Sequence, residues 1–165
     1  MPINTALIAE LKHESINTRK ILERVPSDKL DWAPHEKSMK LGELASHIAG
    51  LTVWVERIMK ADEFNFGTAN FSSAAPATTE DILNKFDKKL AEAINVLELS
   101  QDENFNEMWT VKYGEQVLYQ LPKKVALRNF TFNHTYHHRG QLTVYLRLLD
   151  IPVPGMYGPS ADEKM

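Results

Sequence analysis

Apolar residues recur at every third or fourth position in four stretches of the chain, a spacing typical of amphipathic helices. These stretches cover residues 4–25, 38–60, 78–99 and 122–150. Pro26 ends the first stretch and Pro122 opens the last. Ser38 and either Thr78 or Thr79 are predicted N-caps. The pattern therefore predicts four helices.

The segments between the helices are polar or irregular, with one exception. Residues 64–77 predict a loop, whereas the residues from Met108 to Tyr119 favour a small hairpin or an extended detour. A chain of 165 residues is most simply one domain with one core, here residues 1–165. We predict an all-α fold: an antiparallel four-helix bundle with a small hairpin or extended insertion before the last helix.

Composition narrows the classes of function. The net charge is −3 and the pI about 6.1, so charge gives no reason to expect binding to nucleic acid or to a membrane surface. The absence of cysteine excludes a thiol nucleophile, disulfides and cysteine-ligated metals. No apolar run reaches membrane-spanning length and the first residues do not resemble a signal peptide, so we expect a cytoplasmic protein.

Histidines interrupt the apolar stripes of two predicted helices. On a helical wheel His134 and His138 lie about 40° apart, and we place both at the centre of the buried face. His47 takes an inward position on the second helix in the same way. Such histidines often only hydrogen-bond a carbonyl or hydroxyl, but three of them on two facing helices could hold one metal ion. His137, at the edge of the stripe, could replace His138.

Weaker candidates accompany these histidines. Glu14 and Thr18 fall on the inward side of the first helix, and we expect them to line a cavity beside the metal. Gln141 falls on the buried face of the last helix, where it would line the same cavity and fix helix packing or a ligand's hydrogen bonds. Arg139 falls on the opposite side of that helix, which we expect to face solvent.

Three motifs resemble the DinB/YfiT-like metalloenzyme superfamily. The first joins Asp31-Trp32-Ala33-Pro34 to Leu41-Gly42-Glu43-Leu44-Ala45-Ser46-His47-Ile48. The second is His134-Thr135-Tyr136-His137-His138-Arg139-Gly140-Gln141, and the third is the closing segment 154–162. The similarity spans about residues 3–162. It implies an up-up-down-down type of bundle with a divalent ion held by His47, His134 and His138.

The resemblance also implies a range of functions. The family includes thiol S-transferases that use bacillithiol or mycothiol, and a glutathione-dependent isomerase relative. Three imidazoles leave open positions on Zn²⁺, Ni²⁺, Fe²⁺ or Mn²⁺, where a bound thiol or water would lose its proton more readily. We expect metal-dependent transfer of a low-molecular-weight thiol onto an electrophilic small molecule, in stress or detoxification.

Two alternatives stay open. One is a metal-dependent hydrolase, and the other is a non-catalytic stress protein that binds metal or a small ligand. Homodimers are common in the family, so we expect a homodimer that acts on a small-molecule substrate, without nucleic acid or membrane. The sequence assigns no catalytic residue beyond the three ligands.

Overall fold

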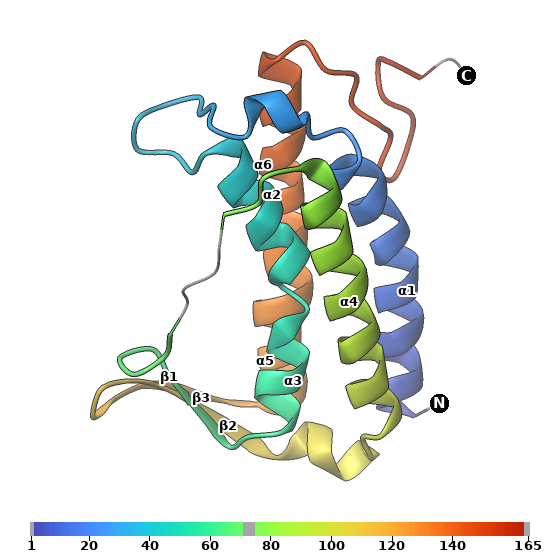
Figure 1. Cartoon of the computed structure of the whole chain (residues 1–165). Helices are drawn as coiled ribbons and strands as arrows, with labels where there is room; N and C mark the ends of the chain where they lie inside the picture. The colour runs from blue at the N-terminus through green and yellow to red at the C-terminus, as the bar shows by residue number, and fades with distance from the viewer. Residues whose placement is uncertain (1, 71–74, 164–165) are drawn as a thin grey trace.

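Four helical rods stand side by side, and a small sheet projects from one end of them (Figure 1). The computed structural model describes residues 2–70 and 75–163. Two rods run in one direction, and they contain α1 (Ile3–Leu22) and α6 (His134–Leu148). The other two run in the opposite direction, and they contain α2 (Leu41–Gly50) with α3 (Val53–Met59), and α4 (Thr79–Glu98). No helix in the described ranges is long and apolar enough to span a bilayer.

The ends of the helices follow local signals in the sequence. Thr78 caps α4, because its hydroxyl accepts a hydrogen bond from the Asp81 amide at 3.1 Å while the Asp81 carboxylate accepts one from the Thr78 amide at 2.9 Å. The single helix expected over residues 38–60 is instead two, since a turn at Leu51 and Thr52 separates α2 from α3. Short 3₁₀ helices cover Ser27–Lys29 and Asp102–Asn106.

The prediction of an all-α fold is wrong, because about 10% of the chain forms a three-stranded mixed sheet. β2 (Met108–Tyr113) and β3 (Gln116–Pro122) form the antiparallel hairpin expected before the last helix. β1 (Glu63–Asn65) pairs in parallel with β2, so the segment expected to be a loop begins with a strand.

Aromatic burial and one side-chain clamp explain why β1 forms. The rings of Phe64 and Phe66 lie 4.9 and 5.9 Å from the ring of Trp54, measured between centroids. Between them, Asn65 accepts a hydrogen bond from the Gly114 amide at 2.9 Å and donates one to the Gly114 carbonyl at 2.9 Å. Gly114 has a φ of 59°, the left-handed conformation that a tight hairpin turn requires. The clamp thus ties β1 to the turn of the hairpin.

The last rod changes its helical type along its length. α5 (Lys123–Leu127) continues through a π-helical segment, Arg128–Asn133, into α6. A π-helical turn holds an additional residue relative to an α-helix, so residues before and after it do not share one wheel. The histidine pair of this rod begins directly after the π segment.

Two apolar clusters fill the bundle. The cluster near the sheet contains Trp109, Phe105 and Phe132, and the other contains Ile48 and Leu142. His47 directly precedes a residue of the second cluster, and His134 follows the first cluster by two residues. Both clusters therefore include residues close in sequence to the histidines.

Candidate metal centre

Three histidine side chains meet between α2 and α6. One ring nitrogen from each of His47, His134 and His138 lies within 4.8 Å of the other two. Nε2 of His47 and Nε2 of His134 are 3.3 Å apart. Metal–nitrogen bonds of about 2.1 Å would put two ligand nitrogens on one ion roughly 3–3.5 Å apart. His47 and His134 have this separation, so the three side chains could hold a single divalent ion, and among the described residues no other group of three His, Cys, Asp or Glu converges in this way.

Gln141 orients one of the three imidazoles. Its Oε1 lies 2.7 Å from Nδ1 of His138. An amide oxygen only accepts, so this contact requires the tautomer with its proton on Nδ1, which leaves the lone pair of Nε2 for a metal ion. Hydrogen bonds of this kind fix the tautomer of metal ligands in proteins. Gln141 is exposed, so the prediction that it lies on the buried face is wrong, and it reaches the site through its contact with His138.

The three imidazoles favour the neutral form, which is the form that binds metal. Burial, together with the charges of His138, His134 and Lys85, lowers the pKa of His47 to about 4. Burial also lowers the pKa of the other two imidazoles. At neutral pH a metal ion therefore has few ligand protons to displace.

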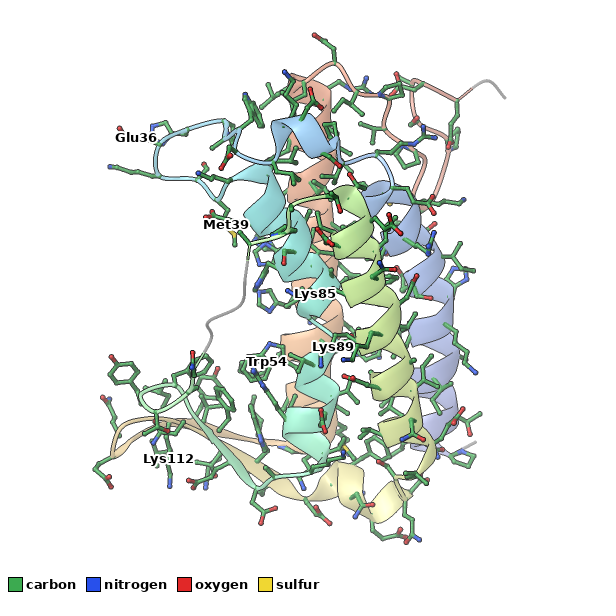
Figure 2. All side chains as sticks on the ribbon, viewed as in Figure 1. Glu36, Met39, Trp54, Lys85, Lys89 and Lys112 are labelled. Carbon is green, nitrogen blue, oxygen red and sulfur yellow. The ribbon has the colours of Figure 1, made fainter. Side chains whose placement is uncertain are left out.

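A groove of about 610 Å³ opens beside His47 and His134. Its lining includes three aromatic side chains and three basic ones, contributed by α3, α4, the π segment and the chain beyond β1. These are Trp54, Phe66, Phe130, Arg57, Lys85 and Lys89. Figure 2 shows Lys85, Lys89 and Trp54 on the open side of the bundle, above the projecting sheet. The site is therefore accessible to a small molecule.

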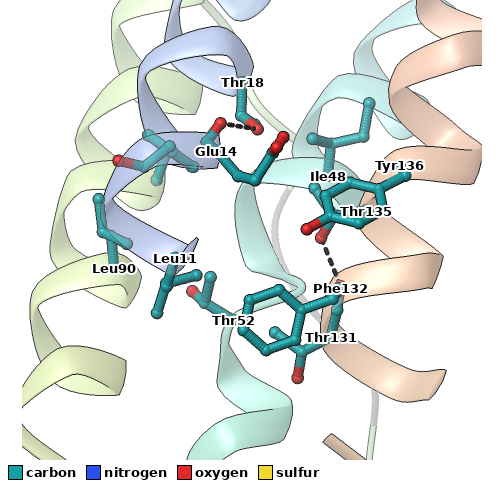
Figure 3. A pocket seen from close by; sticks show the side chains of 12 residues that line it. Leu11, Glu14, Thr18, Ile48, Thr52, Leu90, Thr131, Phe132, Thr135 and Tyr136 are labelled. Atoms are coloured by element: carbon teal, nitrogen blue, oxygen red, sulfur yellow. Dashed lines mark hydrogen bonds between the residues drawn. The ribbon is translucent and has the colours of Figure 1, made fainter. Parts of the chain in front are cut away.

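Glu14 and Thr18 lie in a different place from the one expected (Figure 3). They line a small internal cavity of about 20 Å³, together with apolar residues such as Leu11, Ile48 and Phe132. None of the three histidines lines it. A cavity of this size has room for about one water molecule. The structure thus separates these two polar side chains from the histidine site.

Arg139 is buried, with 2% of its surface exposed, so the prediction that it faces solvent is wrong. Its guanidinium donates to the Glu14 carboxylate at 2.6 Å and to the Thr18 hydroxyl at 3.2 Å. It also contacts the hydroxyl of Tyr157, which in turn donates to Glu14 at 2.9 Å. We refer to Glu14, Thr18, Arg139 and Tyr157 as the arginine cluster.

The wrong prediction for Arg139 has a geometric cause. The buried residues of α6 are Arg139, Leu142 and Leu146. On a wheel of 100° per residue their stripe is centred roughly 110° from His134. The prediction centres the buried face on His134, but α6 packs against α1 as well as α2. The histidine pair therefore lies at the edge of the buried stripe, where half-buried side chains can reach a groove.

The remaining histidines lie outside the site. The ring of His137 is 4.9 Å from that of His138, between centroids, but His137 is exposed and is not one of the three converging side chains. His13 and His35 are exposed as well. The lysines of the groove were not identified from the sequence, because they lie on α4 and reach the site only through tertiary packing.

The arrangement agrees with a comparison to known proteins. The model of the DinB family matches residues 1–164. The chain belongs to the DinB family. Among its relatives, the uncharacterized protein YrdA of Bacillus subtilis (strain 168) is 23% identical over 151 residues, which cover 91% of this chain and 85% of YrdA.

Two solved DinB-like structures have the same fold. One, from Bacillus cereus ATCC 10987, has a TM-score of 0.71 at 22% identity and covers 90% of this chain and 94% of its own. The other, from Bacillus subtilis, has a TM-score of 0.69 at 17% identity, and the match covers 97% of this chain and 99% of that chain. At these identities the likeness establishes the fold of this DinB family member and leaves its chemistry to the site.

Proposed function

We propose that this DinB family protein binds one divalent metal ion through His47, His134 and His138. The observation that carries the proposal is the convergence of three ring nitrogens within 4.8 Å of one another. Three protein ligands leave coordination positions for a substrate, which distinguishes catalytic metal sites from structural ones. The groove beside two of the ligands gives a substrate access to those positions.

For the reaction, we propose transfer of a low-molecular-weight thiol onto an electrophilic small molecule. A bound divalent ion supplies Lewis acidity, which lowers the pKa of a coordinated thiol. The chain contains no cysteine, so the sulfur must come from a co-substrate. The reaction joins that sulfur to an electrophilic carbon and releases the thiol proton and the leaving group.

The roles of the chain's own residues follow from their contacts. The three imidazoles would hold the ion, and Gln141 would fix the tautomer and orientation of His138. The groove, at about 610 Å³, is large enough to hold a thiol and an electrophile together.

The test begins with metal analysis of protein purified without an affinity tag. About one divalent ion per chain is expected, and its removal should lower the melting temperature because the ion binds only the folded state. A panel of electrophiles is then screened with and without added thiol. Turnover that depends on both metal and thiol supports the transferase. Turnover of activated esters without thiol indicates a hydrolase, and metal binding without any turnover indicates a binding protein.

We also propose that the protein is a homodimer. The hairpin exposes several large apolar side chains, among them Val117, Leu118 and Tyr119, and a second copy could cover them. Light scattering measures the mass in solution. A mass near 18.8 kDa, that of one chain, would contradict the proposal.

A further inference from the structure

We propose that the groove beside the histidines binds a small molecule with a carboxylate and an aromatic portion, and that Lys85 holds the carboxylate. The inference deepens the proposed function, because it names the class of substrate for the same site. It rests on the groove being the substrate site.

Lys85 places a cation beside the predicted metal ligands. From α4 its Nζ donates to the carbonyl oxygen and to the hydroxyl of Ser46, at 2.9 and 2.8 Å. Ser46 directly precedes His47 in α2. An ammonium has three N–H donors, so one remains for a ligand in the groove. The two bonds to Ser46 fix where that donor lies.

The charge of Lys85 has no carboxylate partner among the described residues, unlike the charge of its neighbour. Lys89, one turn further along α4, pairs with Glu92 at 2.6 Å. The hydrogen bonds of Lys85 go to uncharged oxygens only. Burial lowers the pKa of Lys85, which reflects the cost of placing an unpaired cation away from water. A bound carboxylate would offset this cost.

The backbone of α2 leaves room for the ammonium. A Cβ atom at Gly50 would lie 3.2 Å from Cε and 3.4 Å from Nζ of Lys85. The glycine lets the lysine side chain lie close against α2. The ammonium therefore occupies a built position and does not extend freely into solvent.

The other end of the groove is aromatic. The ring of Trp54 lies 5.0 Å from that of Phe130 and 5.9 Å from that of Phe66, between centroids, and all three line the groove. Arg57 lies over the ring of Trp54, with its guanidinium carbon 4.8 Å from the centroid. This end presents the flat faces and edges that bind an aromatic group.

The electrostatic balance of the groove favours an anion. Arg57, Lys85 and Lys89 are basic, and Glu43 is the one carboxylate among the described lining residues. The Glu43 carboxylate accepts a hydrogen bond from the Lys40 amide at 2.9 Å, where it caps the start of α2. A ligand that reaches from Lys85 to Trp54 lies alongside His47 and His134, which line the same groove.

Calorimetric titration with a matched pair of probes tests the proposal. The probes are 3-phenylpropanoate and its uncharged analogue 3-phenylpropanamide, and the full chain is titrated in metal-free and metal-loaded forms. The acid should bind about tenfold more tightly than the amide in both forms, since one charge-assisted hydrogen bond separates them. Lys85→Met should remove this preference.

Two further variants serve as controls. Lys88→Met removes an exposed lysine of the same helix that does not line the groove, and it should keep the preference. Lys85→Arg keeps the charge and should keep most of the preference. Thermal unfolding and metal content are measured for each variant, so that a misfolded protein is recognised. If Lys85→Met fails to fold, the comparison of the two probes on the metal-free wild type still tests the proposal, because equal binding of both would overturn it.

Several outcomes would overturn the assignment of Lys85. They are equal or undetectable binding of the two probes to the wild type, an unchanged preference in Lys85→Met, and an equal loss in Lys88→Met. A preference seen only with metal and abolished by His134→Ala would assign the carboxylate to the ion instead. Because the metal-free titration involves neither metal nor thiol, a preference there would stand even if no thiol transfer were found.

Discussion

α6 carries a polar cluster on each of two sides, and the two clusters are completed in different ways. Toward α1, the guanidinium of Arg139 meets the carboxylate of Glu14 at 2.6 Å, and Thr18 and Tyr157 complete the hydrogen bonding. Toward α2, three uncharged imidazoles direct ring nitrogens at one another, two of them 3.3 Å apart. The arginine cluster pairs its own charges, whereas the histidines offer ring nitrogens that could bind a cation.

The two clusters also differ in their exposure to solvent. The side chains of Arg139 and Glu14 are 3% and 12% exposed, so solvent hardly reaches their ion pair. The histidines are half-buried, and two of them line a groove. A closed and charge-balanced cluster serves the stability of the fold, and an open cluster of convergent acceptors serves binding. The following predictions test this distinction, from the largest expected effect to the smallest.

Removal of a metal ligand should have the largest effect. His134→Ala or His138→Ala should weaken metal binding by about a thousandfold or more, since only two imidazoles would remain. His137→Ala should leave the affinity almost unchanged, because that side chain is exposed and does not converge with the others. Calorimetric titration measures the metal affinity of each variant, and metal analysis after dialysis measures how much metal each retains. The reverse order would show that the wrong pair had been identified.

Breaking the arginine cluster should affect stability and not metal binding. Arg139→Met leaves the Glu14 carboxylate without its partner and should lower the free energy of unfolding by about 3 kcal/mol. The double variant Glu14→Leu/Arg139→Met should recover part of this loss, because no unpaired charge stays buried. Urea unfolding measures the loss. A stable variant that no longer holds metal would contradict the division of roles.

Loss of the group that orients His138 should have an intermediate effect. Gln141→Leu removes the acceptor for the imidazole Nδ1–H, and metal affinity should fall about tenfold. Stability of the metal-free protein should hardly change, because Gln141 is exposed. Titration with zinc measures the metal affinity. Urea unfolding of the metal-free variant measures its stability. An effect on stability alone would assign Gln141 to helix packing.

The smallest effect is a dependence of stability on pH. The pKa of His47 falls from 6.5 in the unfolded chain to about 4 in the folded one. Between pH 6.5 and 4 the unfolded chain therefore binds more protons, and the metal-free protein should lose stability as the pH falls through this window. Solvent screening of the half-buried ring keeps the loss modest. In His47→Gln, urea unfolding across the same window should show a shallower slope.

The helices could be predicted because the signals for them lie within short stretches of the sequence. The spacing of apolar residues and the caps indicate the rods, and the alternation before the last helix indicates the hairpin. β1 has three residues, too few to show a period, and its partner β2 lies far along the chain. Its formation depends on the contacts of Phe64, Asn65 and Phe66, which local pattern does not reveal.

The site could be predicted in part for the same reason. The spacing of His134 and His138 is a local property, and so is the inward position of His47. A helical wheel shows how residues are arranged around α6, but it does not show that both α1 and α2 cover the helix. The wheel alone therefore wrongly predicts that Arg139 faces solvent. Lys85 approaches Ser46 from α4, a contact that no spacing within α2 predicts.

The π segment between α5 and α6 adds a residue to one continuous helical rod. Phe130 lies within it and lines the aromatic end of the groove, and the histidine pair begins where it ends. Because a π turn holds one residue more than an α turn, deletion of a single residue there would restore an α-helical turn and leave the two ends of the rod in nearly the same relative orientation. The deletion would instead displace Phe130 relative to the histidines, so the aromatic end of the groove would change with every ligand left in place.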